Sequence, residues 1–176
     1  MIFKRQLLLF SLLIISATTC FAQWQFQSGS VSFIIKNAGL NVDGKFTQME
    51  AKINFNPDQP EKTIIEATVL TKSINTGINL RDKHLKKPEY FDEARFPKIS
   101  LKLISLTGDS KKGYNANFNL SIKGISKELK FPVEFENTGK LSADFTIDRR
   151  DFKVGGNSWV MSDNVRIQLS AQLQKI

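Results

Sequence analysis

The sequence has very few residues of the kinds that build catalytic or metal centres. Its 176 residues include one cysteine and one histidine. A single histidine, His84, excludes a metal site built from several histidines, and no spacing marks a partner for it in a nucleophile–histidine–acid triad. The HExxH and GxSxG motifs and a glycine-rich phosphate loop are missing from the sequence. We therefore expect no catalytic residue, no metal and no cofactor, and a protein that is not an enzyme.

Long apolar runs are missing apart from one short stretch near the N-terminus. Two basic residues precede an apolar segment, 7–15, that is too short to span a bilayer. Cys20-Phe21-Ala22 followed by Gln23 fits a small-x-small cleavage pattern. These features predict a signal peptide over residues 1–22 and a periplasmic or secreted domain over residues 23–176. An uncleaved anchor and lipid attachment at Cys20 are the two alternatives.

Basic residues outnumber acidic residues, but they are not concentrated in one part of the sequence. The sequence has 25 basic and 17 acidic residues. The lysines are spread over the whole chain and are not interleaved with stacking aromatic residues, so we expect no nucleic-acid partner. The excess is compatible with solubility and with peripheral contact with an anionic membrane surface.

Alternation with a period of two residues dominates the remaining sequence. Eight or nine segments carry apolar residues on one face and polar residues on the other, and clusters of turn residues separate them. This pattern is typical of antiparallel strands with one wet face. One short helix is expected over residues 79–87, capped by Asn79 and ended by Pro88. Such a helix cannot cover all the apolar strand faces, so the sheet must close into a barrel or fold into a sandwich.

The alternation also predicts which side chains lie inside. An outer-membrane barrel, whose apolar side chains face lipid, is disfavoured because too few Trp and Tyr residues are present to form aromatic girdles. We expect the apolar alternates to share one interior, where they either fill it or line a ligand cavity, and polar alternates such as Lys52 and Gln168 to be exposed. The expected interior and ligand-binding residues are Phe33, Ile35, Ile53, Phe55, Val69, Leu101, Leu120, Phe131, Phe145, Ile167 and Leu169.

Several motifs resemble those of one family of exported bacterial proteins. Ser-Ile-Asn-Thr at residues 73–76 is followed by Arg-Asp-Lys-His-Leu at residues 81–85, Phe91-Asp92, Phe96-Pro97 and a Lys-Gly block within residues 120–127. Together they resemble the YceI-like family over about residues 24–174. The family motif residues are Arg81, Asp82, His84 and Leu85. The chain departs from the family pattern at Phe118 and Lys153, where glycine is expected.

The resemblance implies an all-β fold, an antiparallel eight-stranded lipocalin-like barrel with one short helix. It also implies a tunnel that holds a long apolar chain, a polyisoprenoid or a similar lipid, and hence an exported binding protein. A second hypothesis is a non-enzymatic barrel with a filled core that acts as a stress-related or protein-interaction module. The charged stretch over residues 81–87 either forms an acid–base or headgroup-binding cluster beside the mouth of the barrel, or Arg81 and Asp82 in it only support the helix and pair with neighbouring strands. The ligand's identity, its donor and acceptor, and the oligomeric state, a dimer included, stay open.

The cleavage pattern predicts where the exported protein begins. N-terminal sequencing of the exported protein should read from Gln23, because small residues stand one and three positions before it. An intact Met1, or a lipid attached to Cys20, would contradict this prediction.

Overall fold

The structure, a computed structural model, describes residues 23–176. The expected signal peptide over residues 1–22 lies outside the described residues. Ten strands and one α-helix occur in the described part of the chain, joined by turns that include three short 3-10 segments. The elements are β1 (Trp24–Asn37), β2 (Leu40–Phe46), β3 (Met49–Phe55), η1 (Pro60–Lys62), β4 (Ile64–Leu70), η2 (Thr71–Ser73), β5 (Ile74–Asn75), α1 (Asn79–Leu85), β6 (Lys98–Asp109), β7 (Gly113–Ile122), β8 (Ile125–Phe135), β9 (Lys140–Asp148), η3 (Arg149–Phe152) and β10 (Met161–Lys175).

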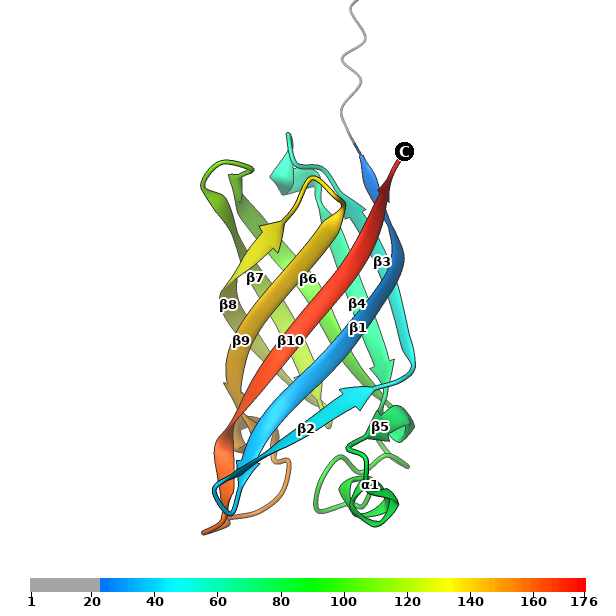
Figure 1. The fold of residues 1–176 in the computed structure, drawn as a ribbon, viewed down its shortest axis with the longest axis vertical. Coiled ribbons are helices and arrows are strands. Elements are labelled where there is room, and N and C mark those ends of the chain that lie inside the picture. The colour runs from blue at the N-terminus through cyan, green and yellow to red at the C-terminus, as the bar shows by residue number, and fades with distance from the viewer. Residues whose placement is uncertain (1–22) are drawn as a thin grey trace, which may run out of the picture.

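Eight of the strands form a closed antiparallel barrel (Figure 1). The order around the barrel is β1, β10, β9, β8, β7, β6, β4 and β3, and β3 pairs again with β1. Strand β1 closes the barrel by pairing with β10 from Trp24–Lys175 to Asn37–Met161. The predicted eight-stranded antiparallel barrel with one short helix is therefore confirmed.

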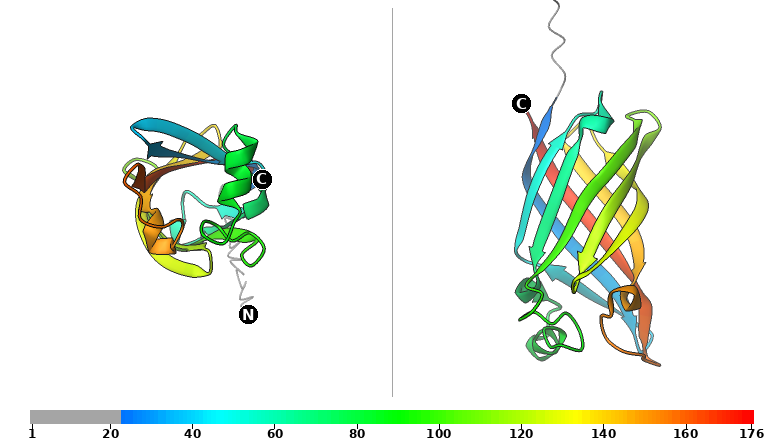
Figure 2. Two further views of the ribbon diagram at one scale, coloured as in Figure 1. Left: turned by 90° about the horizontal axis from the view of Figure 1, so that it is seen from below. Right: turned by 180° about the vertical axis from the view of Figure 1, so that it is seen from behind.

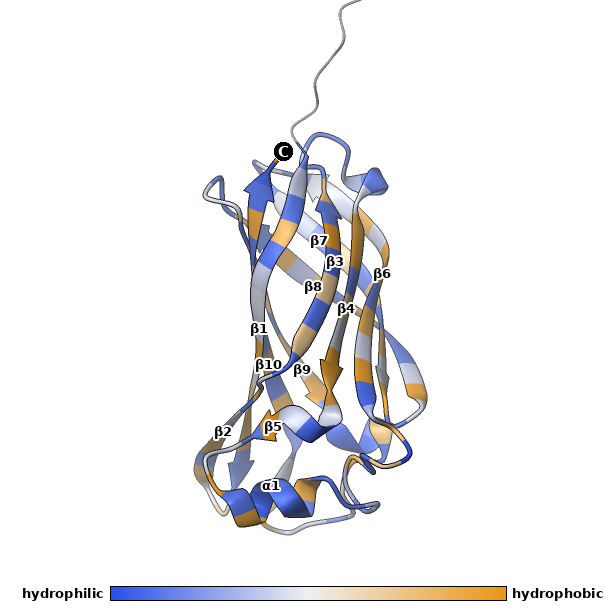
Figure 3. Ribbon diagram, turned by 90° about the vertical axis from the view of Figure 1, so that its right-hand side faces the viewer, coloured by the Kyte–Doolittle hydropathy of each residue, from blue (hydrophilic) through white to orange (hydrophobic). Residues whose placement is uncertain are grey.

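The other edge of β1 is divided between two neighbours. Near its start, Trp24 and Gln25 pair with β3, and from Val31 onward the strand pairs with β2. Within the described strands, residues 26–30 of β1 pair with neither, so a seam opens between β1 and β3 (Figure 3). Met49 of β3 packs across this seam, since a Cβ built on Gly29 would lie 3.2 Å from its Cε. The barrel thus widens toward the end where β2 branches off.

That wide end is covered by β2, β5, α1 and the loops around them (Figure 2). Lys45 and Phe46 of β2 pair with Asn75 and Ile74 of β5, and α1 follows β5 after a short turn. Backbone hydrogen bonds join Gly155 to Glu89 and Ala38 to Val160, at 2.9 and 2.7 Å. The β1–β2 turn, the segment after α1 and the η3–β10 loop therefore meet at one end of the barrel.

The sequence pattern places the apolar faces inside the barrel. Hydropathy alternates along each strand in bands (Figure 3), and the buried apolar residues form one core cluster. Lys52 is exposed as expected, whereas Gln168 is half-buried because its amide donates a hydrogen bond to Asp144 at 3.1 Å. The two-residue turn at Lys123-Gly124 has φ values of 52° and 75°, the geometry of the primed turns that match strand twist.

The helix differs in detail from its prediction. It begins at Asn79 but ends at Leu85, two residues earlier than expected. The N-cap is Ile78, which gives no side-chain hydrogen bond, so the prediction that Asn79 caps the helix is wrong. The Asp82 carboxylate, one turn further along, takes up the Thr76 backbone N–H at 2.9 Å and thereby orders the chain before the helix.

Close packing of β1 on β2 gives a stability prediction. A methyl group at Gly44 would lie 2.6 and 2.7 Å from Cε2 and Cε1 of Phe33, so the ring would have to leave its place in the wall. We expect Gly44→Ala to lower the free energy of unfolding by about 1–3 kcal/mol. The matched control is Gly156→Ala, where the new methyl group has no atom within 4 Å. Urea unfolding should separate the two variants, and equal stability would contradict the close packing.

Candidate functional site

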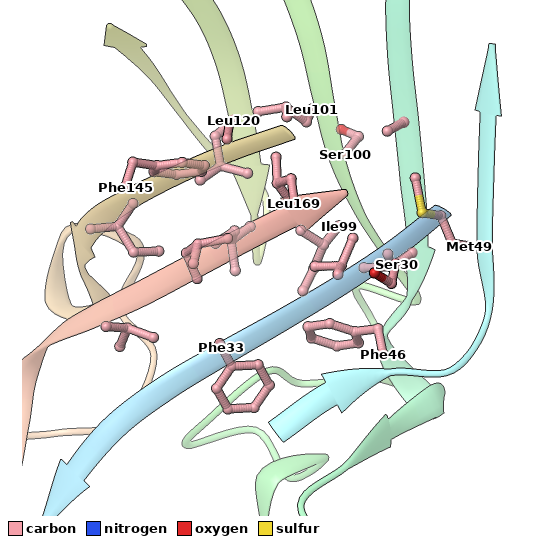
Figure 4. Close-up of a pocket in the computed structure, with 18 of the residues that line it drawn as sticks. Ser30, Phe33, Phe46, Met49, Ile99, Ser100, Leu101, Leu120, Phe145 and Leu169 are labelled. Carbon is pink, nitrogen blue, oxygen red and sulfur yellow. The ribbon is translucent and has the colours of Figure 1, made fainter. Parts of the chain in front are cut away.

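An apolar cavity of about 230 Å³ occupies the barrel interior (Figure 4). It is larger than the roughly 150 Å³ at which apolar cavities stay dry and bind small apolar molecules. The lining residues of β10 run from Met161 to Ala171. At about 3.3 Å per residue on a strand tilted by about 40°, this stretch covers roughly 25 Å along the barrel axis. The cavity is therefore long and narrow.

Polar groups are few on the cavity wall. Within the described part of the chain, no Asp, Glu or Lys residue lines it. Its only charged residues, Arg81 and Arg149, come from α1 and η3 at the wide end. The remaining polar residues in the lining are Ser30, Asn37, Thr68, Thr76, Ser100, Ser142 and Ser170. A ligand along most of the cavity would therefore gain apolar contact and little directional bonding.

The structure brings together ten of the eleven interior residues expected from the sequence. These ten line the cavity, and Phe33, Leu101, Leu120, Phe145 and Leu169 point into it from different strands (Figure 4). Their role in holding a ligand stays a prediction. The wall also contains residues that the alternation did not single out, including Phe46, Leu85, Tyr90 and Phe91. These come from β2, α1 and the segment after it, which close on the barrel only in three dimensions.

Phe55 is the expected interior residue that does not line the cavity. Its side chain is fully buried at the narrow end, 4.5 Å from the Phe135 ring and 5.3 Å from the Tyr114 ring between centroids. Trp24 packs edge-on against Phe135 at 5.3 Å. These four aromatic side chains, which we call the aromatic plug, fill the interior where β1 meets β3. The cavity is therefore blind at this end.

Three phenylalanine rings stack along the middle of the wall. The ring centroids of Phe118 and Phe131 are 5.0 Å apart, and those of Phe131 and Phe145 are 3.9 Å apart, with interplanar angles of 12° and 5°. Phe118 stands where the family pattern has glycine, so its ring takes up space in the interior. The stack gives the cavity a rigid flat side made of carbon.

The motif on α1 forms a compact hydrogen-bonded unit beside the cavity. The buried Asp82 carboxylate accepts a hydrogen bond from the Thr76 hydroxyl at 2.6 Å, in addition to that from the Thr76 N–H. Arg81 donates to the Thr76 hydroxyl and carbonyl oxygens at 2.7 and 2.6 Å. Leu85 and Arg81 line the cavity, whereas His84 is exposed and packs edge-on against Tyr90 at 5.0 Å. Both Arg81 and Asp82 therefore support the local fold, and Arg81 also reaches the cavity.

Arg149 was not singled out in the sequence, yet it organises the loop at the wide end. Its buried guanidinium donates to the carbonyl oxygens of Val154, Gly156 and Ser162 at 2.8, 3.0 and 3.0 Å, and to Asp163 at 2.7 Å. These partners lie up to fourteen residues away, so no local spacing could have indicated them. The loop between η3 and β10 is thereby fixed against the cavity.

Groups suited to acid–base or metal chemistry are scattered in the described residues. No cluster of three His, Cys, Asp or Glu side chains occurs there. The hydrogen bonds from Lys102 to Glu66 and from Arg166 to Asp144 lower the pKa of each carboxyl, and Asp144 in turn raises the pKa of Arg166. Burial in the aromatic plug, with nearby Asp109 and Asp58, raises the pKa of Tyr114. All four groups lie outside the cavity lining. No described helix has the length and apolar character needed to cross a membrane.

Known proteins resemble this chain both in sequence and in fold. The YceI-like domain model matches residues 24–173. A UPF0312 protein of Staphylococcus aureus is 33% identical over 116 residues, which are 65% of this chain and 65% of that protein's length. The crystal structure of Burkholderia cenocepacia BcnA aligns with a TM-score of 0.76 at 21% identity, covering 83% of this chain and 96% of BcnA. A polyisoprenoid binding domain from Saccharophagus degradans aligns with a TM-score of 0.62 at 12% identity, covering 89% of this chain and 100% of that domain.

The buried arginine gives a second stability prediction. Arg149→Met should lower the free energy of unfolding by about 2–4 kcal/mol, because it leaves three carbonyl groups and a carboxylate without their charged donor. Arg150→Met is the matched control, since Arg150 is exposed and contacts the same Asp163 only at 3.5 Å. That variant should lose less than about 1 kcal/mol. Urea unfolding measures both, and a small loss in both variants would contradict the structural role of Arg149.

Proposed function

The chain belongs to the YceI-like family, and we propose that it is an exported protein that holds one long apolar chain, a polyisoprenoid or a similar lipid, in its barrel. The observation that carries this proposal is the long, blind cavity of about 230 Å³ with no acidic or lysine residue in its lining. The polyisoprenoid-binding domain from Saccharophagus degradans has the same fold, which supports the same class of ligand here. The proposed location is the periplasm or the exterior, after cleavage before Gln23.

The shape of the cavity favours a slender chain over a compact ligand. Its length of roughly 25 Å along the barrel axis suits an extended molecule. Each methylene group that leaves water would contribute about 0.8 kcal/mol, so affinity would grow with the length of chain that fits. The blind end at the aromatic plug sets an upper limit to that length.

The polar groups near the wide end set the orientation of the ligand. Arg81 and Arg149 line the cavity there, whereas the middle offers the phenylalanine stack. A charged headgroup in the middle would lose its hydration and would find no charged partner there, which costs about 1–3 kcal/mol or more. The tail would therefore point toward the aromatic plug, with any headgroup near α1.

The filled-core alternative differs in what the interior side chains do. A filled barrel needs side chains that occupy the whole lumen, whereas the Phe118, Phe131 and Phe145 rings stack along one side and leave the cavity open. Native mass spectrometry of the purified protein, followed by lipid extraction, separates the two functions. A copurifying lipid of constant mass supports the carrier. Protein that is lipid-free after purification and stays lipid-free after incubation with polyprenol would contradict it.

A polar replacement in the middle of the cavity tests the site itself. Phe145→Asn should reduce copurifying lipid several-fold, because it interrupts the apolar contact next to Phe131. Measured on delipidated protein, the free energy of unfolding should fall by about 1–3 kcal/mol. Thr146→Asn is the matched control, because Thr146 is the next residue of β9 and is exposed on the outer face.

Two outcomes distinguish the carrier from the filled core in this experiment. Lipid loss confined to the Phe145 variant, with wild-type lipid content in the Thr146 variant, supports the carrier. A large loss of stability at Phe145 in a protein whose wild type never carried lipid would favour the filled core.

A further inference from the structure

Exposed apolar side chains gather at one end of the barrel. Eight large apolar residues are exposed among the residues that the structure describes, and five of them belong to the wide end. These five, which we call the apolar rim, are Leu40, Ile78, Leu80, Trp159 and Val160. Trp159 is fully exposed and Leu80 is 78% exposed. Exposed apolar side chains that gather in one place mark an interaction site, whereas single ones are common on any protein surface.

The rim residues stand on three segments that contact one another. Leu40 begins β2 directly after the β1–β2 turn, Ile78 and Leu80 flank the start of α1, and Trp159 and Val160 end the η3–β10 loop. The hydrogen bond from Ala38 to Val160 joins the first segment to the third. Lys123 donates to the carbonyl oxygens of Pro88 and Lys153 and so joins the third segment to the chain after α1. The three segments therefore lie at the same end of the barrel and are joined by hydrogen bonds (Figures 1 and 2).

The cavity reaches the same place. Asn37, Leu85 and Met161 line the cavity, and each lies on or next to a segment that carries a rim residue. None of the five rim residues lines the cavity. The rim therefore lies beside the wide end of the cavity, exposed and outside its lining.

Charge on α1 selects the kind of partner. Lys83 on α1 is exposed, and of the two lysines directly after the helix, Lys86 is half-exposed and Lys87 is exposed. The only carboxylate on the helix, Asp82, is buried and accepts the hydrogen bonds of Thr76. Glu89 and Glu93 come only after these lysines, so the positive charge is concentrated on α1 and the two residues that follow it. Lysines beside apolar side chains favour an anionic lipid surface.

The arrangement of the rim favours a lipid surface over a folded protein. Its side chains stand on three separate segments at one end of the barrel. Each can enter a fluid layer without a complementary shape, and a Trp side chain is suited to the interface between lipid and water. We propose that the wide end of the barrel docks on an anionic bilayer through the apolar rim and through Lys83, Lys86 and Lys87, in and directly after α1. Docking would let an apolar chain pass directly between the bilayer and the cavity. This role of the docking rests on the proposed function.

Vesicle binding tests the docking surface directly. The purified protein without residues 1–22 is sedimented with vesicles of phosphatidylglycerol and phosphatidylcholine in equal parts, and with vesicles of phosphatidylcholine alone. We expect binding to the anionic vesicles, weakened by salt. The double variant Leu80→Ser/Trp159→Ser should bind the anionic vesicles at least about tenfold more weakly, because neither position then inserts an apolar side chain into the bilayer. The matched control Ile64→Ser/Ile104→Ser removes two exposed apolar side chains away from the rim and should bind as the wild type does.

Fluorescence gives a second readout that does not depend on the double variant. In a Trp24→Phe background Trp159 is the only tryptophan, and its emission should shift to shorter wavelength on the anionic vesicles. Three results would each overturn the docking surface. They are no binding of the wild-type protein to the anionic vesicles, no shift in the Trp159 emission, and an equal loss of vesicle binding in both double variants. The docking surface would also be overturned if the wild-type protein bound a folded protein partner and did not bind vesicles.

The lipid content of the same samples separates docking from the carrier function. Both double variants should copurify with as much lipid as the wild type, because none of the four residues lines the cavity. Lipid-free protein that still binds vesicles through the rim would overturn the carrier and keep the docking surface. Lipid-loaded protein that does not bind vesicles would overturn the docking surface and keep the carrier.

Discussion

The pairing of β1 with β10 is the contact on which the rest of the structure depends. Every barrel strand has one apolar face, and one helix of seven residues cannot cover eight such faces. The pairing runs along nearly the whole of both strands and turns an open sheet into a closed one. Closure removes two sheet edges and gives all the apolar faces one interior. The cavity exists because that interior is longer than its side chains can fill.

The divided second edge of β1 gives the barrel its two different ends. Where Trp24 and Gln25 pair with β3, the wall is narrow, and the aromatic plug fills it. Where β1 leaves β3 and pairs with β2, the wall is wide, and α1 and the loop held by Arg149 cover it. The charged residues of the cavity, the lysines in and directly after α1 and the apolar rim all belong to the wide end. The difference between the two ends of the barrel therefore follows from the one point in the sheet where β1 changes its partner from β3 to β2.

The period of two residues predicted antiparallel strands that close into a barrel or a sandwich, and the family resemblance predicted the barrel. The same period states which face each side chain occupies, and ten of the eleven residues that it placed in the interior line the cavity. The period does not state depth along the barrel, which is why Phe55 was expected beside the cavity and lies in the plug. Arg149 could not be found, since its partners are loop carbonyls that only the fold brings together. Lys153 could be marked: it stands where the family pattern has glycine, and its φ of 53° lies in the region that glycine favours. In this backbone conformation the carbonyl oxygen of Lys153 accepts a hydrogen bond from the Lys123 ammonium group.

A cavity closed at one end requires the ligand to enter and leave by the same route. The plug packs Phe55 and Tyr114 to nearly complete burial, so opening that end would disrupt the core of the barrel. At the other end, the covering segments are held by a few hydrogen bonds between loops, as at Gly155 and Glu89. Loops that cover the end of a barrel open locally at lower free energy than the strands of the barrel itself. An apolar chain that entered there would pass the rim before it reached the phenylalanine stack. Release would then need a surface at the rim that accepts the chain, because water does not.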